Sequence, residues 1–128
     1  MPVTTPLIKV DAVKALGAKV VMHGDSFDEA AVHARVLTES EGFTFIHPFD
    51  DPDVIAGQGT VAVELVRQAQ QPLDYVFVCC GGGGLLAGMA AYLRYVWPQT
   101  RIIGVEPEDA ACVQAALEKG RRVTLREV

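Results

Sequence analysis

The sequence predicts an α/β fold, built from an open, mostly parallel sheet with helices on both of its faces. Two observations favour this class. Short apolar runs rich in β-branched and aromatic residues alternate with helix-compatible segments along the chain. Half of the 128 residues are hydrophobic, which is enough for a packed core. Strands that alternate with helices in this way form parallel sheets whose two faces are both covered.

The first 46 residues are expected to form helix, strand, helix and strand. The first helix starts near Pro6 and ends at Gly17, because proline suits a first helical turn and glycine suits a helix end. The second starts with the capping box from Ser26 to Glu29 and ends at Gly42. The two strands are expected at residues 19–23 and 43–46.

Residues 47–53 combine two prolines with three acidic residues and are the best place for the chain to pass between two lobes. Asp51, just before Pro52, fits an N-cap. The helix that follows, 54–70, carries Gly57 and Gly59, which predict close packing or close approach to a ligand. The remaining elements are expected to be a strand at 76–80, a helix from 85 to about 97, a strand at 101–106 and a helix at 109–119.

Four consecutive glycines, Gly81 to Gly84, stand between the strand at 76–80 and the next helix. Inside a helix each would cost about 1 kcal/mol relative to alanine. At the carboxyl end of a parallel strand, however, their N–H groups and the helix dipole can form an anion site, for which phosphate is the usual ligand. The run therefore favours a phosphate site over a tight turn that binds nothing.

Two other interpretations of this stretch remain open to test. Residues 82–87 fit the dinucleotide pattern G-x-G-x-x-A, with Glu106 roughly 20 residues on to hold a ribose. Residues 75–93 carry no charge and are long enough to cross a bilayer, which takes about 20 residues. The glycines would break such a membrane helix, so we expect no membrane span.

Composition narrows the classes of partner. The net charge of −5, with no basic cluster to offset it, argues against nucleic acid. Three cysteines, two of them the adjacent Cys79 and Cys80, form no disulfide framework and suit a reducing cytoplasm. His23, His33 and His47 lack metal-ligand spacing, and no signal peptide is visible.

Three motifs together resemble the pyridoxal-phosphate enzymes of the tryptophan-synthase β-like fold (fold type II), among them the biosynthetic threonine dehydratases, or threonine deaminases. The resemblance covers essentially the whole chain in one register. The motifs are His47-Pro48-Phe49-Asp50-Asp51-Pro52, Val54-Ile55-Ala56-Gly57-Gln58-Gly59-Thr60 and Gly81-Gly82-Gly83-Gly84-Leu85.

The resemblance implies that pyridoxal 5'-phosphate is the cofactor and that its phosphate is held by the backbone N–H groups of Gly81, Gly82, Gly83, Gly84 and Leu85. It implies dehydration and deamination of L-threonine to 2-oxobutanoate and ammonia, the entry to isoleucine synthesis, in a homo-oligomer. The alternatives are a serine dehydratase or serine racemase of the same fold, a dinucleotide-binding oxidoreductase module, and a domain that binds nothing by itself.

The same resemblance assigns residues 1–46 to the C-terminal part of a small lobe and residues 47–128 to the core of the large cofactor-binding lobe. The family's Schiff-base lysine lies in a Ser-x-Lys stretch, and none of Lys9, Lys14, Lys19 and Lys119 stands in that motif. We therefore expect the catalytic lysine outside this chain, which would then be an internal part of the enzyme, inactive alone.

Related serine racemases and dehydratases bind a divalent cation with a glutamate at the position of Glu106, a carbonyl near Ala110 and an acid near position 112. Here that last residue is Cys112, and a thiol is a soft ligand poorly suited to Mg²⁺ or Ca²⁺. We expect no metal site, with Glu106 as a solvated strand end.

Overall fold

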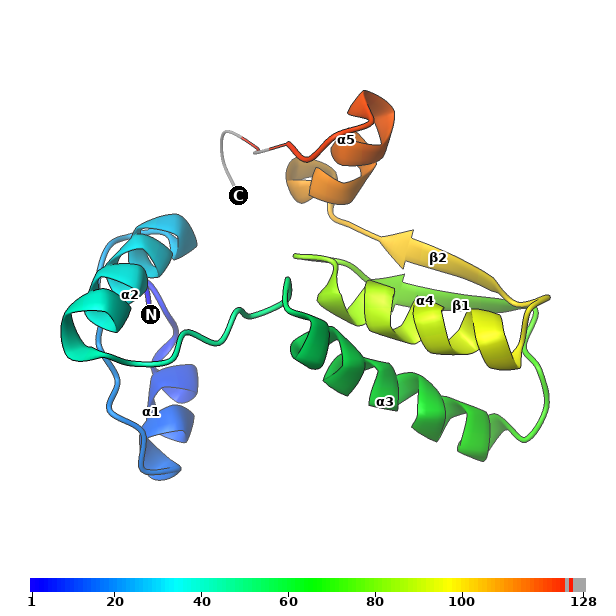
Figure 1. Ribbon diagram of the computed structural model, residues 1–128, viewed down its shortest axis with the longest axis horizontal. Helices are drawn as coiled ribbons and strands as arrows, with labels where there is room; N and C mark the ends of the chain where they lie inside the picture. Colours follow the sequence, from blue (N-terminus) through cyan, green and yellow to red (C-terminus); the bar gives the residue numbers. More distant parts are fainter. Residues whose placement is uncertain (124, 126–128) are drawn as a thin grey trace. The chain divides into compact units, whose positions relative to one another are not determined.

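The computed structural model describes residues 1–123 and 125. The chain divides into two compact units, Met1–Phe45 and Ile46–Val128. Figure 1 shows a helical first unit, and a second in which helices and parallel strands alternate. Over the described residues, no helix is both long and apolar enough to cross a bilayer.

The first unit contains helices α1 (Leu7–Ala15) and α2 (Phe27–Glu41). The expected capping box is present, since the Ser26 hydroxyl accepts from the N–H of Glu29 at 3.2 Å. The Glu29 carboxylate in turn accepts from the N–H of Asp25 at 2.6 Å. Gly42 ends α2 in the left-handed conformation, with φ of 70°, as the sequence predicted.

The strands expected at 19–23 and 43–46 are wrong, because neither segment takes strand structure. A strand requires a ladder of backbone hydrogen bonds with a neighbour. Segment 19–23 makes only isolated bonds to the start of the chain, such as the N–H of His23 to the carbonyl of Met1 at 2.9 Å. An apolar, β-branched run indicates strand propensity but does not supply the partner.

The second unit holds the remaining elements, and Figure 1 shows α3 and α4 running side by side in the same direction. Strands β1 and β2 pair in parallel, with Tyr75 opposite Arg101 and Cys79 opposite Val105. The elements are α3 (Pro52–Ala69), β1 (Tyr75–Cys79), α4 (Gly84–Val96), β2 (Arg101–Val105), a 3₁₀ turn (Glu108–Ala110) and α5 (Cys112–Lys119).

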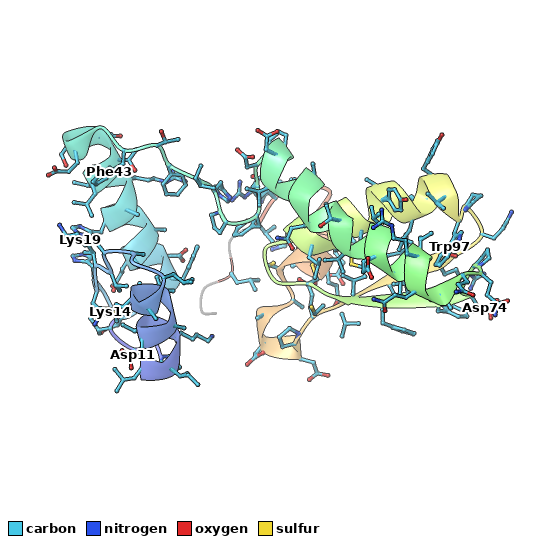
Figure 2. All side chains as sticks on the ribbon, turned by 90° about the horizontal axis from the view of Figure 1, so that it is seen from below. Asp11, Lys14, Lys19, Phe43, Asp74 and Trp97 are labelled. Atoms are coloured by element: carbon cyan, nitrogen blue, oxygen red, sulfur yellow. The ribbon has the colours of Figure 1, made fainter. Side chains whose placement is uncertain are left out.

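One hydrophobic core joins α3, β1 and α4, and Ala62 and Leu93 are fully buried in it. Figure 2 labels Trp97, which closes the core at the C-terminal end of α4, near Asp74 at the start of β1. The full set of buried residues in this core is Ala62, Val76, Val78, Met89, Leu93 and Trp97.

Helices α3 and α4 touch backbone to backbone at Gly59 and Gly88. A Cβ added at Gly88 would lie 2.6 Å from the Gly59 nitrogen, and one added at Gly59 would lie 3.1 Å from the Gly88 carbonyl oxygen. Gly59 thus serves the close packing that the sequence predicted, whereas a Cβ at Gly57 would meet open space. The distance between the two helices is therefore short and fixed, and so is the distance between the chain segments that lead into their N-termini.

The sheet shows the parallel α/β character that the sequence predicted, but the described helices cover only one of its faces. Along β1 burial alternates: Val76 and Val78 point into the core, while Tyr75 and Phe77 are 51% and 69% exposed. Helices α3 and α4, which form the core together with β1, pack on one face of the sheet, so the opposite face of β1 has no helical cover among the described residues.

Candidate functional site

The four glycines lie where the sequence places them, between the carboxyl end of β1 and the start of α4. Gly83 adopts the left-handed conformation (φ 89°) and is the N-cap of α4, which Gly84 begins. One further hydrogen bond, from the N–H of Cys80 to the carbonyl of Val105 at 2.8 Å, extends the pairing to the edge of the loop.

A continuous row of free donors follows. Among the described residues, no acceptor is bonded to the N–H groups of residues 81–86, and the first N–H to find one is that of Ala87, at 2.9 Å from the Gly83 carbonyl oxygen. Gly81 and Gly82 are exposed to solvent. Unpaired N–H groups at a helix start carry partial positive charge, so this edge attracts an anion.

The four glycines fall into two groups by what surrounds them. A side chain at Gly82 would strike the ring of Phe49, and one at Gly84 would lie 2.7 Å from the carbonyl oxygen of Phe49. At Gly81, by contrast, an added Cβ meets nothing within 4 Å, and at Gly83 it meets only Val113, at 3.9 Å. Gly82 and Gly84 therefore make room for Phe49, whereas Gly81 leaves open space beside the free donors.

The expected role of residues 47–53 was a passage between lobes, and their contact with the glycine loop was missed. Two N–H groups, of Asp50 at 2.7 Å and of Phe49 at 3.3 Å, donate to Nδ1 of His47. Asp51 caps α3 as predicted, because its carboxylate accepts from the N–H groups of Asp53 and Val54 at 2.9 and 3.1 Å. The signal available in the sequence was an aromatic residue, Phe49, two positions before the helix cap Asp51.

Glu106 is not the solvated strand end that we expected. Its two carboxylate oxygens accept from the N–H groups of Val113 and Gln114, both at 2.9 Å, so it caps α5 from the end of β2. Burial acts to raise the pKa of Glu106, but these hydrogen bonds, with a further one from Cys112, outweigh it and hold the pKa below its ordinary value. With both oxygens bonded to backbone, the carboxylate is poorly placed to hold a ribose.

Two cysteines flank the first glycine. Cys112 Sγ lies 3.3 Å from the Gly81 carbonyl oxygen and 3.5 Å from Glu106 Oε1, and Cys80 Sγ lies 3.9 Å from the same carbonyl oxygen. Burial, followed by the negative charge of Glu106, raises the pKa of the Cys80 thiol. Burial and the bond to Glu106 raise the pKa of Cys112. Both groups are therefore protonated thiols at neutral pH and weak nucleophiles.

The histidines and lysines are placed elsewhere. His23 and His33 stack in the first unit, with ring centroids 3.9 Å apart, while His47 belongs to the second unit. Over residues 1–123 and 125, no group of three or more histidine, cysteine or carboxylate side chains is arranged to hold a metal ion. All four lysines, at positions 9, 14, 19 and 119, are exposed.

Known proteins match the whole chain. The model of the pyridoxal-phosphate dependent enzyme family matches residues 1–128. The biosynthetic, chloroplastic threonine dehydratase of Arabidopsis thaliana is 59% identical over 128 residues, which are 100% of this chain and 22% of that protein. The chain thus spans about a fifth of the length of that relative.

Two solved structures extend the comparison. The processed form of threonine deaminase isoform 2 from Solanum lycopersicum superposes with a TM-score of 0.90 at 52% identity, covering 100% of this chain and 37% of that one. Maize serine racemase superposes with a TM-score of 0.87 at 31% identity, covering 98% of this chain and 38% of that one. The fold is therefore that of the fold type II enzymes, and the chain belongs to the family of pyridoxal-phosphate dependent enzymes.

Proposed function

We propose that this chain is the phosphate-binding part of a threonine dehydratase, which converts L-threonine to 2-oxobutanoate and ammonia. The observation that carries the proposal is the row of free N–H groups at the carboxyl end of β1. The relatives named as threonine dehydratases and deaminases, at 52–59% identity over the whole chain, support the choice of substrate.

The residues fit a phosphate group. A phosphate ester carries close to two negative charges, and N–H groups at a helix start stabilise such an anion through charge-assisted hydrogen bonds and the helix dipole. We assign this role to Gly81, Gly82, Gly83, Gly84 and Leu85. The space beside Gly81 leaves those donors accessible, since a Cβ placed there meets no described atom within 4 Å beyond the glycine and its chain neighbours.

When bound, pyridoxal phosphate supplies an electron sink for charge that develops at the substrate α-carbon. The contribution of this chain is to bind and orient that cofactor by its phosphate. We also propose that residues 1–46 belong to a small lobe and residues 47–128 to a large cofactor-binding lobe. The lysine that reacts with the cofactor then comes from another part of the enzyme.

A second candidate is a serine dehydratase or serine racemase of the same fold, favoured by the 31% identity to maize serine racemase. The full-length enzyme separates these possibilities. Threonine dehydratase activity releases 2-oxobutanoate from L-threonine, serine dehydratase activity releases pyruvate from L-serine, and a racemase converts L-serine to D-serine. A preference for L-serine would overturn the assignment of threonine.

The phosphate role has its own test. Gly81→Asp places a carboxylate beside the loop, at a position where the added Cβ meets nothing within 4 Å, so we expect it to weaken binding of pyridoxal phosphate by at least about tenfold, through repulsion between like charges. Binding of pyridoxal, which lacks the phosphate, should change little. Gln99→Asp is the matched control, because it adds the same charge in the exposed turn after α4, about 20 Å from the loop along a 13-residue helix. Equal affinities of the two variants for pyridoxal phosphate would exclude the phosphate role.

We further propose that the full-length enzyme is a homo-oligomer acting on an amino acid in a reducing compartment such as the cytoplasm. The free thiols of Cys79, Cys80 and Cys112 support a reducing setting. The Arabidopsis relative is named as chloroplastic, so fractionation of the source cells tests the location. Light scattering of the purified enzyme tests the assembly.

A further inference from the structure

Residues 47–50 are folded into a turn by one side chain. Nδ1 of His47 accepts the N–H groups of both Phe49 and Asp50, in the way that an asparagine or aspartate oxygen holds an Asx turn. The rings of His47 and Phe49 meet edge to face, with centroids 4.7 Å apart. The backbone and the ring of Phe49 are therefore both oriented by His47.

Phe49 contacts the glycine loop at two separate points. Its ring occupies the space that a side chain at Gly82 would need, and its carbonyl oxygen occupies the space that a side chain at Gly84 would need. These two glycines enclose Gly83, whose left-handed conformation sets the course of the loop. Contact on both sides of that residue restricts the backbone angles that aim the free N–H groups.

The segment that follows Phe49 also fixes its position. Two residues later Asp51 caps α3, and α3 is in backbone contact with α4 through Gly59 and Gly88. The loop is the N-terminal entry of α4 and the turn is the N-terminal entry of α3. Figure 1 shows that these two entries lie at the same end of the helix pair. The helix pair therefore carries both partners of the contact at a fixed spacing.

We propose that His47 and Phe49 are positioning residues for the phosphate loop: His47 sets the turn, and Phe49 holds the loop from Gly82 to Gly84 in the form that aims its N–H groups at the cofactor phosphate. This assignment rests on the proposed function. Neither side chain reacts. Their contribution is to order the loop before the anion arrives, which lowers the entropic cost of binding.

The test uses the full-length enzyme and four variants. His47→Leu removes the acceptor and Phe49→Ala removes the ring, whereas His47→Asn keeps an acceptor at nearly the same place. Phe43→Ala is the control, since Phe43 is an exposed phenylalanine of the first unit (Figure 2). We expect His47→Leu and Phe49→Ala to raise the Kd for pyridoxal phosphate by about tenfold, the loss expected from one or two hydrogen bonds or a half-buried ring. His47→Asn and Phe43→Ala should stay within about threefold of the wild type.

A second measurement reads the loop without any cofactor. Amide hydrogen exchange of the peptide that contains residues 87–90, whose first N–H is bonded to the Gly83 carbonyl oxygen, should quicken in the apo forms of His47→Leu and Phe49→Ala and stay at the wild-type rate in His47→Asn. Peptides from the C-terminal half of α3 report general loss of structure, and they should be unchanged. This readout remains informative when cofactor affinity is too weak to measure.

The possible failures are distinguishable. Loss of affinity in Gly81→Asp with wild-type affinity in Phe49→Ala and His47→Leu would leave the phosphate site intact and overturn the positioning role. Unchanged affinity in all three would overturn the phosphate site, and exchange at residues 87–90 would still show whether Phe49 orders the loop. Rescue by His47→Asn of both affinity and exchange would support the turn as the cause.

Discussion

The thiol of Cys112 lies 3.3 Å from the carbonyl oxygen of Gly81, although 31 residues separate them in the chain. The two atoms bring the N-terminal end of α5 against the first residue of the glycine loop. In a planar trans peptide the C=O and the following N–H point in opposite directions. A carbonyl turned towards Cys112 therefore turns the N–H of Gly82 away from that thiol.

Removal of the Cys112 thiol should loosen this peptide unit. We expect Cys112→Ala to raise the Kd of the full-length enzyme for pyridoxal phosphate by about threefold to tenfold, because a weak hydrogen bond to the loop is lost. Cys112→Ser retains a donor and should remain close to the wild type. Equilibrium titration of the cofactor checks both values, and identical affinities for alanine, serine and cysteine would show that the Gly81 carbonyl needs no partner.

The capping carboxylate predicts a pH dependence of stability. Hydrogen bonds hold the pKa of Glu106 below its ordinary value despite burial. A lowered pKa in the folded state contributes stability that is fully present above the unfolded pKa, about 4.3 for glutamate, and that is lost as the pH falls through the folded pKa. Glu106→Gln should therefore destabilise the protein at neutral pH and have a smaller effect at about pH 3.

Denaturant titration at the two pH values measures this difference in the free energy of unfolding. Glu108→Gln is the control, since the Glu108 carboxylate accepts no hydrogen bond from the described residues and should show no such change. A destabilisation by Glu106→Gln that is equal at both pH values would contradict the capping role.

The contact between α3 and α4 predicts opposite effects of the same substitution at two glycines. Gly88→Ala places a methyl group against the backbone of Ile55 and Gly59, so we expect a loss of about 1–3 kcal/mol in the free energy of unfolding. Gly57→Ala meets open space inside a helix and should gain up to about 1 kcal/mol through helix propensity. Thermal and denaturant unfolding of the two variants checks the signs, and a stabilising Gly88→Ala would contradict the close approach.

The 128-residue chain by itself should release no 2-oxobutanoate from L-threonine when pyridoxal phosphate is supplied. Its four lysines are exposed and none stands in the family's Ser-x-Lys motif, so the covalent and proton-transfer steps lack their residue. The assay must subtract the reaction of free cofactor. Release above that background, abolished by a substitution within the chain, would show that it contains a complete catalytic set.

The sequence predicted the α/β elements of the second unit well because local signals there agree with packing. Three positions form the cap or turn that their residue types favour: Asp51 before Pro52, the glycine run after an apolar strand, and Gly120 after α5. The strands at 19–23 and 43–46 were wrong because a strand depends on a neighbour, which propensity does not describe. The sequence pattern predicted cover on both faces of the sheet, but such cover depends on which helices the chain contains.

For the candidate site, the sequence predicted which backbone N–H groups are free to bind an anion, but not which residues hold the glycine loop in place. Glycine types indicate close approach without saying to what, and here Gly82 and Gly84 accommodate Phe49, a residue more than 30 positions earlier. Glu106 was misjudged for the same reason, since its partners in α5 depend on how the 3₁₀ turn reverses the chain. Contacts between elements of this kind follow from tertiary structure rather than from local pattern.

The uncovered face of β1 determines the solubility of the isolated chain. Tyr75 and Phe77 stack their rings, with centroids 6.4 Å apart, on a surface open to water, and the parallel strand beneath them has no helix over that side among the described residues. Parallel sheets are ordinarily sealed on both faces. The isolated 128-residue chain should therefore self-associate through this face and bind hydrophobic dyes, and it will have to be handled at low concentration. Its solubility, rather than the chemistry of the loop, will decide which experiments need the longer polypeptide.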